Sequence, residues 1–255
     1  MSDVFHGCTV TDARRERKTA KEVHVKRSLV QTVTVLGTVL GITGLCVVLG
    51  GRSVKADDDD HGGYEAKVRI GFDIAPVPLN LKNKDIELVG YGSYIVNVQA
   101  DCNGCHTSDP TMEYSVPGNP YLLPPLNGKR KIVNPAAYLA GGSDFGNLAP
   151  GSYEILSRNL TPDKTGRPEG GHTYEEFVQI MRKGTDFDHA HPTCAGPVNA
   201  GCIPAPFNGA LLQIMPWPTF QSMTDHDLRA IYEYLTAIPC IEGPPAPSLL
   251  HNDCH

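Results

Sequence analysis

Apolar residues recur at helical spacing in three stretches of the chain. The first stretch lies at residues 84–100, where Leu88, Tyr91 and Ile95 follow one another at intervals of three and four residues. This is the period of an amphipathic helix. Gly92 weakens such a helix, so we expect that another helix approaches it closely.

The second stretch carries its own start and stop signals. Thr173, with Glu176 three residues later, forms a capping box before a helix predicted at Tyr174–Lys183, and Gly184 predicts the end of that helix. Its apolar face is formed by Phe177, Ile180 and Met181.

The third stretch lies near the C-terminus. Thr224 and Asp227 form a capping-box-like start, and Pro239 ends the helix that follows. The apolar face of this helix is formed by Leu228, Ile231, Tyr232 and Leu235. The 26 glycines and 21 prolines concentrate in the second half of the chain, which indicates many loops around a few helices. The predicted fold class is mainly α.

A long uncharged stretch, Ser28–Gly51, precedes these helices. As a helix it would span roughly 36 Å, enough to cross a bilayer core of about 30 Å. Seven Lys and Arg residues crowd residues 14–27, on its N-terminal side. The positive-inside rule then places residues 1–27 in the cytoplasm and residues 28–51 among the lipids of the inner membrane. Everything after residue 51 is expected on the extracytoplasmic side.

Two alternatives exist for this stretch, a buried core helix and a signal peptide. Val54 and Ala56 fit the small-residue pattern that precedes a signal cleavage site. Residues 52–84, which include the acidic run Asp57–Asp60, are predicted to be a linker. That run and His61 could also bind a metal, but the glycines that follow favour a solvated linker.

Eight cysteines are present, and four of them bracket short loops rich in Pro and Gly. In an oxidising compartment, such spacing favours disulfide bonds between Cys194 and Cys202 and between Cys240 and Cys254. The alternative is that these four remain reduced. Two further cysteines fall in the cytoplasmic and apolar segments and are predicted to be free thiols: Cys8 and Cys46.

The last two cysteines belong to a motif that indicates a cofactor. Residues 102–106 read Cys-Asn-Gly-Cys-His, and C-x-x-C-H is the attachment signature of haem c. The thiols of Cys102 and Cys105 lie about one helical turn apart, so that both can reach the two vinyl groups of one porphyrin. His106 can then bind the iron from the proximal side.

This motif has other interpretations. A thioredoxin-like dithiol needs a strand before the motif, whereas the preceding residues are predicted to be helical. A zinc site needs two further ligands at matched spacing, and none is evident in the sequence. A chance match in a five-residue pattern is the remaining alternative.

At this point the chain resembles the single-domain, class I bacterial cytochromes c over about residues 85–241. The resemblance rests on GSYIVNVQADCNGCHT, on SRNLTPDKTGRPEGGHTYEEFVQIMRKGTDFD and on MPWPTFQSMTDHDLRAIYEYLTAIP. These blocks are similar to those in the cytochrome subunits of membrane-bound alcohol and sugar dehydrogenases. Those subunits usually carry three such domains, whereas this chain has one C-x-x-C-H.

The resemblance implies a cytochrome c-like fold with three main helices around one covalently attached haem. The chain departs from the family by its long loop insertions, and residues 242–255 are predicted to be a C-terminal tail. The resemblance implies that the first and last helices cross at a contact between Gly92 and either Tyr232 or Tyr234. It also implies that Met215, in the loop before the last helix, is the sixth iron ligand. The alternatives are an open site or another residue: Met112, Met181, Met223, His172, His189, His191 or His226.

Three residues are further candidates for haem binding. Arg158, Asn159 and Trp217 could donate hydrogen bonds to the propionates, and Arg offers a fork of donors. The alternative is ordinary surface or loop packing. The insertions at about 107–157 and 186–210 could cover the haem edge or bind a partner.

These features predict an electron carrier rather than an enzyme, with redox proteins as partners. No nucleophile–base constellation is evident, and a net charge of −6 does not suggest nucleic-acid binding. One alternative is a haem peroxidase-like enzyme or gas sensor with an open distal site. Another is a dedicated subunit of a dehydrogenase complex.

Overall fold

A computed structural model of the protein describes residues 58–108, 110–116, 118–122, 130–199 and 201–255. The predicted cytoplasmic segment 1–27 and the predicted anchor 28–51 lie outside the described residues, as do Cys8 and Cys46. Within the described ranges, no helix combines the length and the apolar composition that crossing a bilayer requires.

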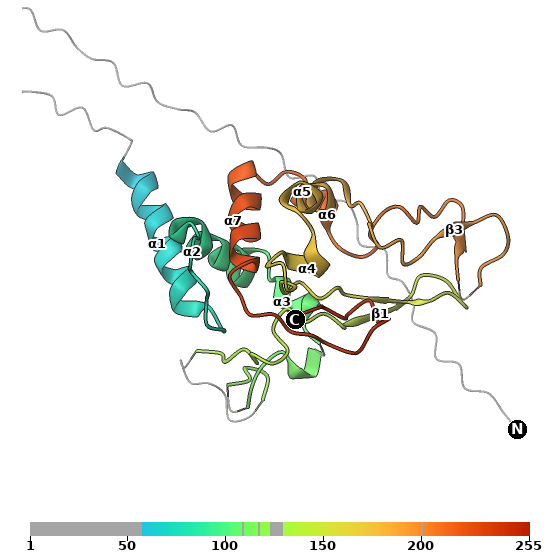
Figure 1. Ribbon diagram of the computed structural model, residues 1–255, viewed down its shortest axis with the longest axis horizontal. Coiled ribbons are helices and arrows are strands. Elements are labelled where there is room, and N and C mark those ends of the chain that lie inside the picture. The colour runs from blue at the N-terminus through green and yellow to red at the C-terminus, as the bar shows by residue number, and fades with distance from the viewer. Residues whose placement is uncertain (1–57, 109, 117, 123–129, 200) are drawn as a thin grey trace, which may run out of the picture. The chain divides into compact units, whose positions relative to one another are not determined.

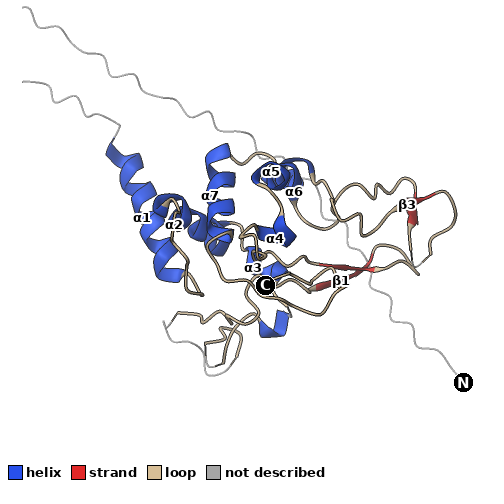
Figure 2. Cartoon of the chain, in the orientation of Figure 1, coloured by secondary structure: helices blue, strands red, loops and turns tan. Residues whose placement is uncertain are grey.

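The described part of the chain combines helices and long loops with two small two-stranded sheets (Figure 2). Its helices are α1 (Asp58–Ile74), α2 (Ile86–Tyr94), the π-helical turn η1 (Ile95–Gln99), α3 (Cys102–His106), the 3₁₀ turn η2 (Pro110–Met112), α4 (Pro168–Gly171), α5 (Tyr174–Lys183), α6 (Trp217–Phe220) and α7 (Asp225–Leu235). Strands β1 (Asp144–Asn147) and β2 (Glu154–Leu156) pair antiparallel, and β3 (Thr193–Cys194) and β4 (Ile203–Pro204) pair parallel.

Helices α2 and α7 cross (Figure 1). Gly92 lies at the crossing, as the resemblance implies. A Cβ atom at Gly92 would overlap the carbonyl group of Ala230 and lie 2.8 Å from the Cβ of Tyr234. The aromatic partner at the crossing is therefore Tyr234, which is fully buried. Val89 and Val96 are buried beside Gly92, so this crossing forms part of the core.

Residues 52–84 are predicted to be a linker, but part of this segment forms a helix. Residues 58–74 form α1, which lies beside α2 (Figure 1). Gly71 sits against the backbone of Gly90, and the side chains of Val68 and Phe72 surround Gly90. Few large apolar side chains are needed where two helices meet through glycines. The apolar periodicity of α1 is consequently weak. The polar residues at its start led to the prediction of a linker.

The predicted middle helix has the predicted bounds. Helix α5 begins after Thr173, whose side chain accepts a hydrogen bond from the Glu176 N–H while the Glu176 carboxylate accepts from the Thr173 N–H. It ends at Gly184, which adopts a φ of 66°. The same reciprocal cap between Thr224 and Asp227 starts α7.

Both predicted disulfide bonds are present. Cys194 and Cys202 are joined with a Cα–Cα distance of 5.6 Å, and Cys240 and Cys254 with one of 5.8 Å. The second bond ties the C-terminal segment 242–255 to Cys240, in the loop that follows α7. This segment is anchored further by Asn252, whose buried side-chain amide donates to the carbonyl oxygens of Thr161 and Pro162.

Candidate functional site

The C-x-x-C-H motif forms the short helix α3, which neighbouring loops hold in place. Its entry residue, Asp101, has a left-handed φ of 46°, which turns the chain sharply after η1. The buried Asn103 side chain accepts a hydrogen bond of 2.9 Å from the Leu139 N–H. The carbonyl oxygen of His106 accepts one of 2.8 Å from the Gly141 N–H. The motif is thus fixed at both of its ends.

The imidazole of His106 is oriented by a backbone carbonyl. Its Nδ1 lies 2.8 Å from the carbonyl oxygen of Arg158, and because a carbonyl only accepts, Nδ1 carries the proton. Burial lowers the pKa of His106, which favours the neutral ring. Nε2 therefore has a free lone pair, and a histidine held this way has the usual arrangement of a metal ligand.

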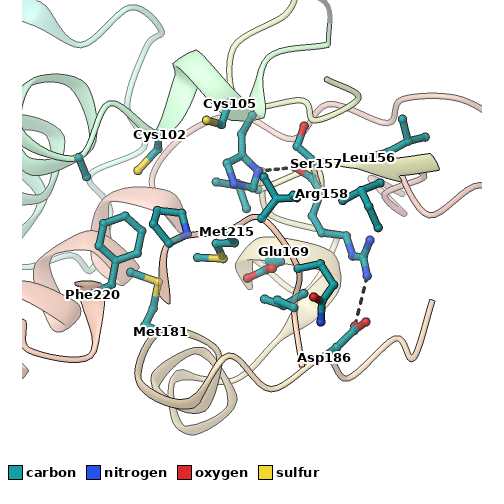
Figure 3. Close-up of a pocket in the computed structure, with 18 of the residues that line it drawn as sticks. Cys102, Cys105, Leu156, Ser157, Arg158, Glu169, Met181, Asp186, Met215 and Phe220 are labelled. Carbon is teal, nitrogen blue, oxygen red and sulfur yellow. Dashed lines mark hydrogen bonds and ion pairs between the residues drawn. The ribbon is translucent and has the colours of Figure 1, made fainter. Parts of the chain in front are cut away.

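Cys102 and Cys105 are free thiols at one side of the pocket described below (Figure 3). Burial, followed by the nearby charges of Asp101 and Cys105, raises the pKa of Cys102 to about 12. Burial and the charge of Asp101 also raise the pKa of Cys105. Dithiol oxidoreductases instead depress the pKa of the attacking cysteine. This, together with the helices that precede the motif, disfavours the thioredoxin-like alternative.

A pocket lies against the motif and encloses about 1100 Å³ of empty space, part of it open to solvent. It is lined by the helices α3 to α7, the strands β1 and β2 and the loops beside them, so segments distant in sequence meet here. Its apolar lining includes Ile155, Leu160, Phe177, Met181, Leu212, Met215, Phe220, Ile231 and Leu235. The side chain of Met215 lies within this pocket (Figure 3). His106 also lines it.

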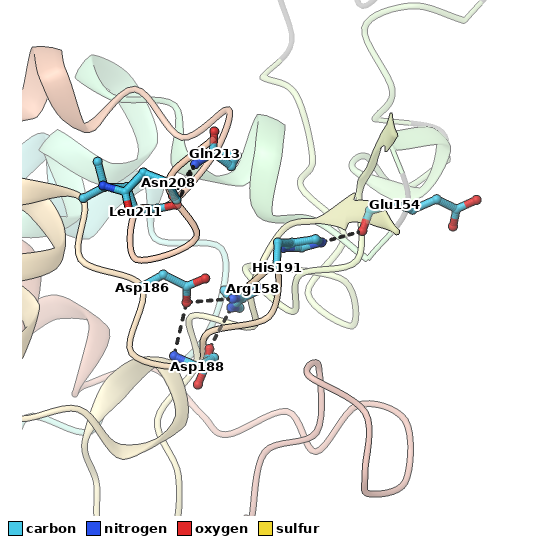
Figure 4. A network of polar contacts seen from close by, with 8 residues as sticks. All are labelled: Glu154, Arg158, Asp186, Asp188, His191, Asn208, Leu211 and Gln213. Carbon is cyan, nitrogen blue, oxygen red and sulfur yellow. Dashed lines mark hydrogen bonds and ion pairs between the residues drawn. The ribbon is translucent and has the colours of Figure 1, made fainter. Parts of the chain in front are cut away.

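The side of the pocket away from the thiols is polar (Figure 3). Arg158 is 9 % exposed, and its Nε and Nη2 donate to Asp188 at 2.8 Å and to Asp186 at 3.2 Å (Figure 4). Glu169 also faces the pocket, and burial raises its pKa to about 7 against the opposing effect of Arg158. The sequence prediction missed these three acids because Asp186 and Asp188 lie in a loop and Glu169 lies in the four-residue α4, where no periodic pattern marks them.

The three residues predicted to contact the propionates lie in different places. Arg158 lines the pocket, but Asn159 and Trp217 are not among the lining residues. The amide of Asn159 donates instead to the carbonyl oxygens of Ile241 and Leu250, which anchors the C-terminal segment. The indole N–H of Trp217 donates to the carbonyl oxygen of Leu212 at 3.2 Å. Both side chains are thus hydrogen-bonded to loop carbonyl groups, and their contact with propionates stays a prediction.

Among the alternative iron ligands, Met181 and His191 also line the pocket. Met181 packs on the apolar face of α5, as predicted, and His191 contacts the carbonyl oxygen of Glu154 (Figure 4). Met223 packs against the core, and Met112 is half exposed. Of the predicted site residues, the structure therefore brings together Cys102, Cys105, His106, Met215 and Arg158.

The pocket fits a haem by its chemistry. Haem is a flat, largely apolar ring with vinyl groups on one side and charged propionates on the other. The pocket has an apolar body, two thiols at one side and an arginine at the other. It also offers a neutral imidazole nitrogen and a thioether, two donors that bind haem iron in cytochromes c.

No family model matches the chain. It is similar to the cytochrome c subunit of a quinone-dependent alcohol dehydrogenase from Gluconobacter oxydans, with 28 % identity over 156 residues, or 60 % of this chain. It is also similar to the cytochrome subunit of fructose dehydrogenase from Gluconobacter japonicus, with 26 % identity over 161 residues, or 61 % of this chain. The chain spans about a fifth of the length of these relatives, 22 % of each.

Proposed function

We propose that this protein is a c-type cytochrome that transfers single electrons through one covalently bound haem. The observation that carries the proposal is the placement of Cys102, Cys105 and an oriented His106 on the wall of one apolar pocket that also holds Met215. When bound, haem supplies the one-electron couple of its iron.

The chain's own residues would have separate roles in this function. Cys102 and Cys105 would hold the ring through thioether bonds, each formed as a thiol S–H adds across a vinyl group. His106 would bind the iron through Nε2, in the orientation that the Arg158 carbonyl imposes. The apolar side chains around the ring would exclude water, which favours the less charged ferrous state.

Met215 would be the sixth ligand, and Arg158 would face the propionates. Ligation by His and Met raises the reduction potential and leaves no open position for a substrate. That arrangement supports electron transfer rather than peroxidase chemistry or gas sensing. The presence of Met215 inside the same pocket as His106 supports this ligand pair.

We also propose that residues 28–51 tether the haem domain to the extracytoplasmic face of the inner membrane. The two disulfide bonds support an oxidising compartment for the described residues. The similar proteins are named as cytochrome subunits of dehydrogenases, which supports a membrane dehydrogenase as the redox partner. A partner of this kind would co-purify with the full chain after mild detergent extraction.

The test is to produce the full chain in a host with intact export and cytochrome c maturation. We expect a coloured protein with one haem, retained on denaturation and heavier by one haem in its mass spectrum. A pyridine haemochrome spectrum under alkali would count the haems and identify their covalent attachment. A colourless chain of unmodified mass would overturn the proposal.

A further inference from the structure

The loop that presents Met215 has an unusual backbone. The Met215 N–H donates to the carbonyl oxygen of Gln213 at 2.7 Å, and the Trp217 N–H donates to that of Met215 at 2.9 Å. Each of these hydrogen bonds joins residues two positions apart in the chain, which defines a γ-turn. One γ-turn is centred on Ile214 and the other on Pro216, so the two turns flank Met215. The turn at Pro216 has a φ of −80° and a ψ of 44°, near the favourable form.

The turn at Ile214 is the strained form. Its φ is 68°, and a β-branched residue rarely adopts a positive φ because Cβ crowds the backbone. The Ile214 side chain is 54 % exposed, so burial of that side chain does not offset the strain. Strained backbone persists where the surrounding structure over-determines it. Contacts that hold the ends of the loop can supply this restraint.

Trp217 provides such a restraint. Its indole N–H donates to the carbonyl oxygen of Leu212 at 3.2 Å, which closes the segment 212–217 on itself. The N–H of Leu212 donates to the carbonyl oxygen of Gly184 at 2.7 Å, which fixes the start of the segment to the end of α5. The indole ring also lies directly against Gly184, where a Cβ atom would overlap it.

We propose that Trp217 is a positioning residue for the sixth ligand: its indole N–H holds the strained turn at Ile214, and this turn keeps the Met215 thioether in the pocket. The inference rests on the proposed ligation of haem iron by Met215. It replaces the predicted propionate contact of Trp217. It also predicts that removing the indole bond shifts Met215 off the iron without releasing the haem.

The first test is Trp217→Phe, which keeps an aromatic ring against Gly184 but removes the donor. The measurement is imidazole binding to the ferric holoprotein. Imidazole competes with Met215 for the iron, so its apparent affinity reports the fraction of molecules in which Met215 has left the iron. Loss of one hydrogen bond should tighten imidazole binding about fivefold. The absorption band of Met-ligated ferric haem should weaken in parallel, with the haem still covalently attached.

The matched control is Tyr232→Phe, which removes a similar bond of 3.1 Å from an aromatic side chain to the carbonyl oxygen of His172. Tyr232→Phe should leave the imidazole affinity unchanged, even if it lowers the urea midpoint of unfolding as much as Trp217→Phe does. Wild-type imidazole affinity in Trp217→Phe, or equal shifts in both variants, would overturn the proposal.

A second pair of variants tests the strained turn without touching Trp217. Asn accepts a positive φ more readily than Ile does, so Ile214→Asn should favour the bound thioether and weaken imidazole binding about fivefold. Ile214→Val keeps the β-branch and should match wild type. Equal imidazole affinities in these two variants would refute the role of the strain.

These results are distinguishable from failure of the proposed function. If the wild-type chain carried no covalent haem, the proposed cytochrome itself would fail. If Met215→Ala kept both the haem and the Met–iron band, the iron would have another ligand. That result would refute the proposed role of Trp217 but not the proposed cytochrome function.

Discussion

The crossing of α2 and α7 makes the substitution Gly92→Ala a sharp test of the fold. An added Cβ would overlap the backbone carbonyl of Ala230, which no rotamer change can relieve. The two helices would have to move apart at a place where Val89, Val96 and Tyr234 are fully buried. We therefore expect Gly92→Ala to destabilise the protein, although alanine is the better helix former.

The magnitude follows from two opposing effects. Overpacking a core costs about 1–3 kcal/mol, and the upper end applies here because backbone must move. Alanine regains about 1 kcal/mol over glycine in a helix interior. The net loss in the free energy of unfolding should be about 2 kcal/mol. For a domain of this size, that lowers the midpoint of thermal unfolding by about 4–8 °C.

The assay is urea unfolding of the holoprotein, with Gly63→Ala as the control. Gly63 lies in α1, and no neighbouring atom comes within 4 Å of the position that an added Cβ would take. Alanine at Gly63 should therefore add up to about 1 kcal/mol of stability. A Gly92→Ala variant as stable as wild type, or stabilised like Gly63→Ala, would refute the close packing of α2 on α7.

Three further predictions follow from the same structure. Met215→Ala should abolish the Met–iron absorption band and lower the reduction potential while the haem remains attached, measured by spectroscopy and redox titration; an unchanged band would assign the ligand elsewhere. Burial acts to raise the pKa of Asp227, but hydrogen bonds from Thr224 and Tyr91 outweigh it and lower that pKa below 3.8. The charged carboxylate therefore stabilises the fold above that pH, and this stabilisation is lost as the pH falls. The difference in unfolding free energy between wild type and Asp227→Asn, measured in urea, should shrink in acid. A difference that stays constant with pH would contradict this. Replacing both Cys240 and Cys254 by Ser should cost about 3 kcal/mol of unfolding free energy, as expected for a loop of about 15 residues, whereas an unchanged urea midpoint would show that this crosslink does not restrain the unfolded chain.

Local signals allowed the sequence to determine several elements by itself. Capping residues act on backbone groups within one turn, so Thr173 and Gly184 defined α5 with its bounds. The three functional groups of C-x-x-C-H are neighbours in the chain, so their proximity needed no tertiary information. The disulfide partners were likewise close in sequence, at separations of 8 and 14 residues.

Contacts between distant segments were decided only by the tertiary structure. Helix α1 is held by glycine-mediated packing on α2, which leaves little apolar periodicity to detect. The amide of Asn159 bonds the carbonyl groups of Ile241 and Leu250, which only the folded loops bring near. Glu169 shares a pocket with Arg158 and Asp186 for the same reason. Residue type indicated that these side chains need polar partners, but the partner of each depends on how the loops pack around the pocket, because hydrogen bonds and ion pairs form only at short range.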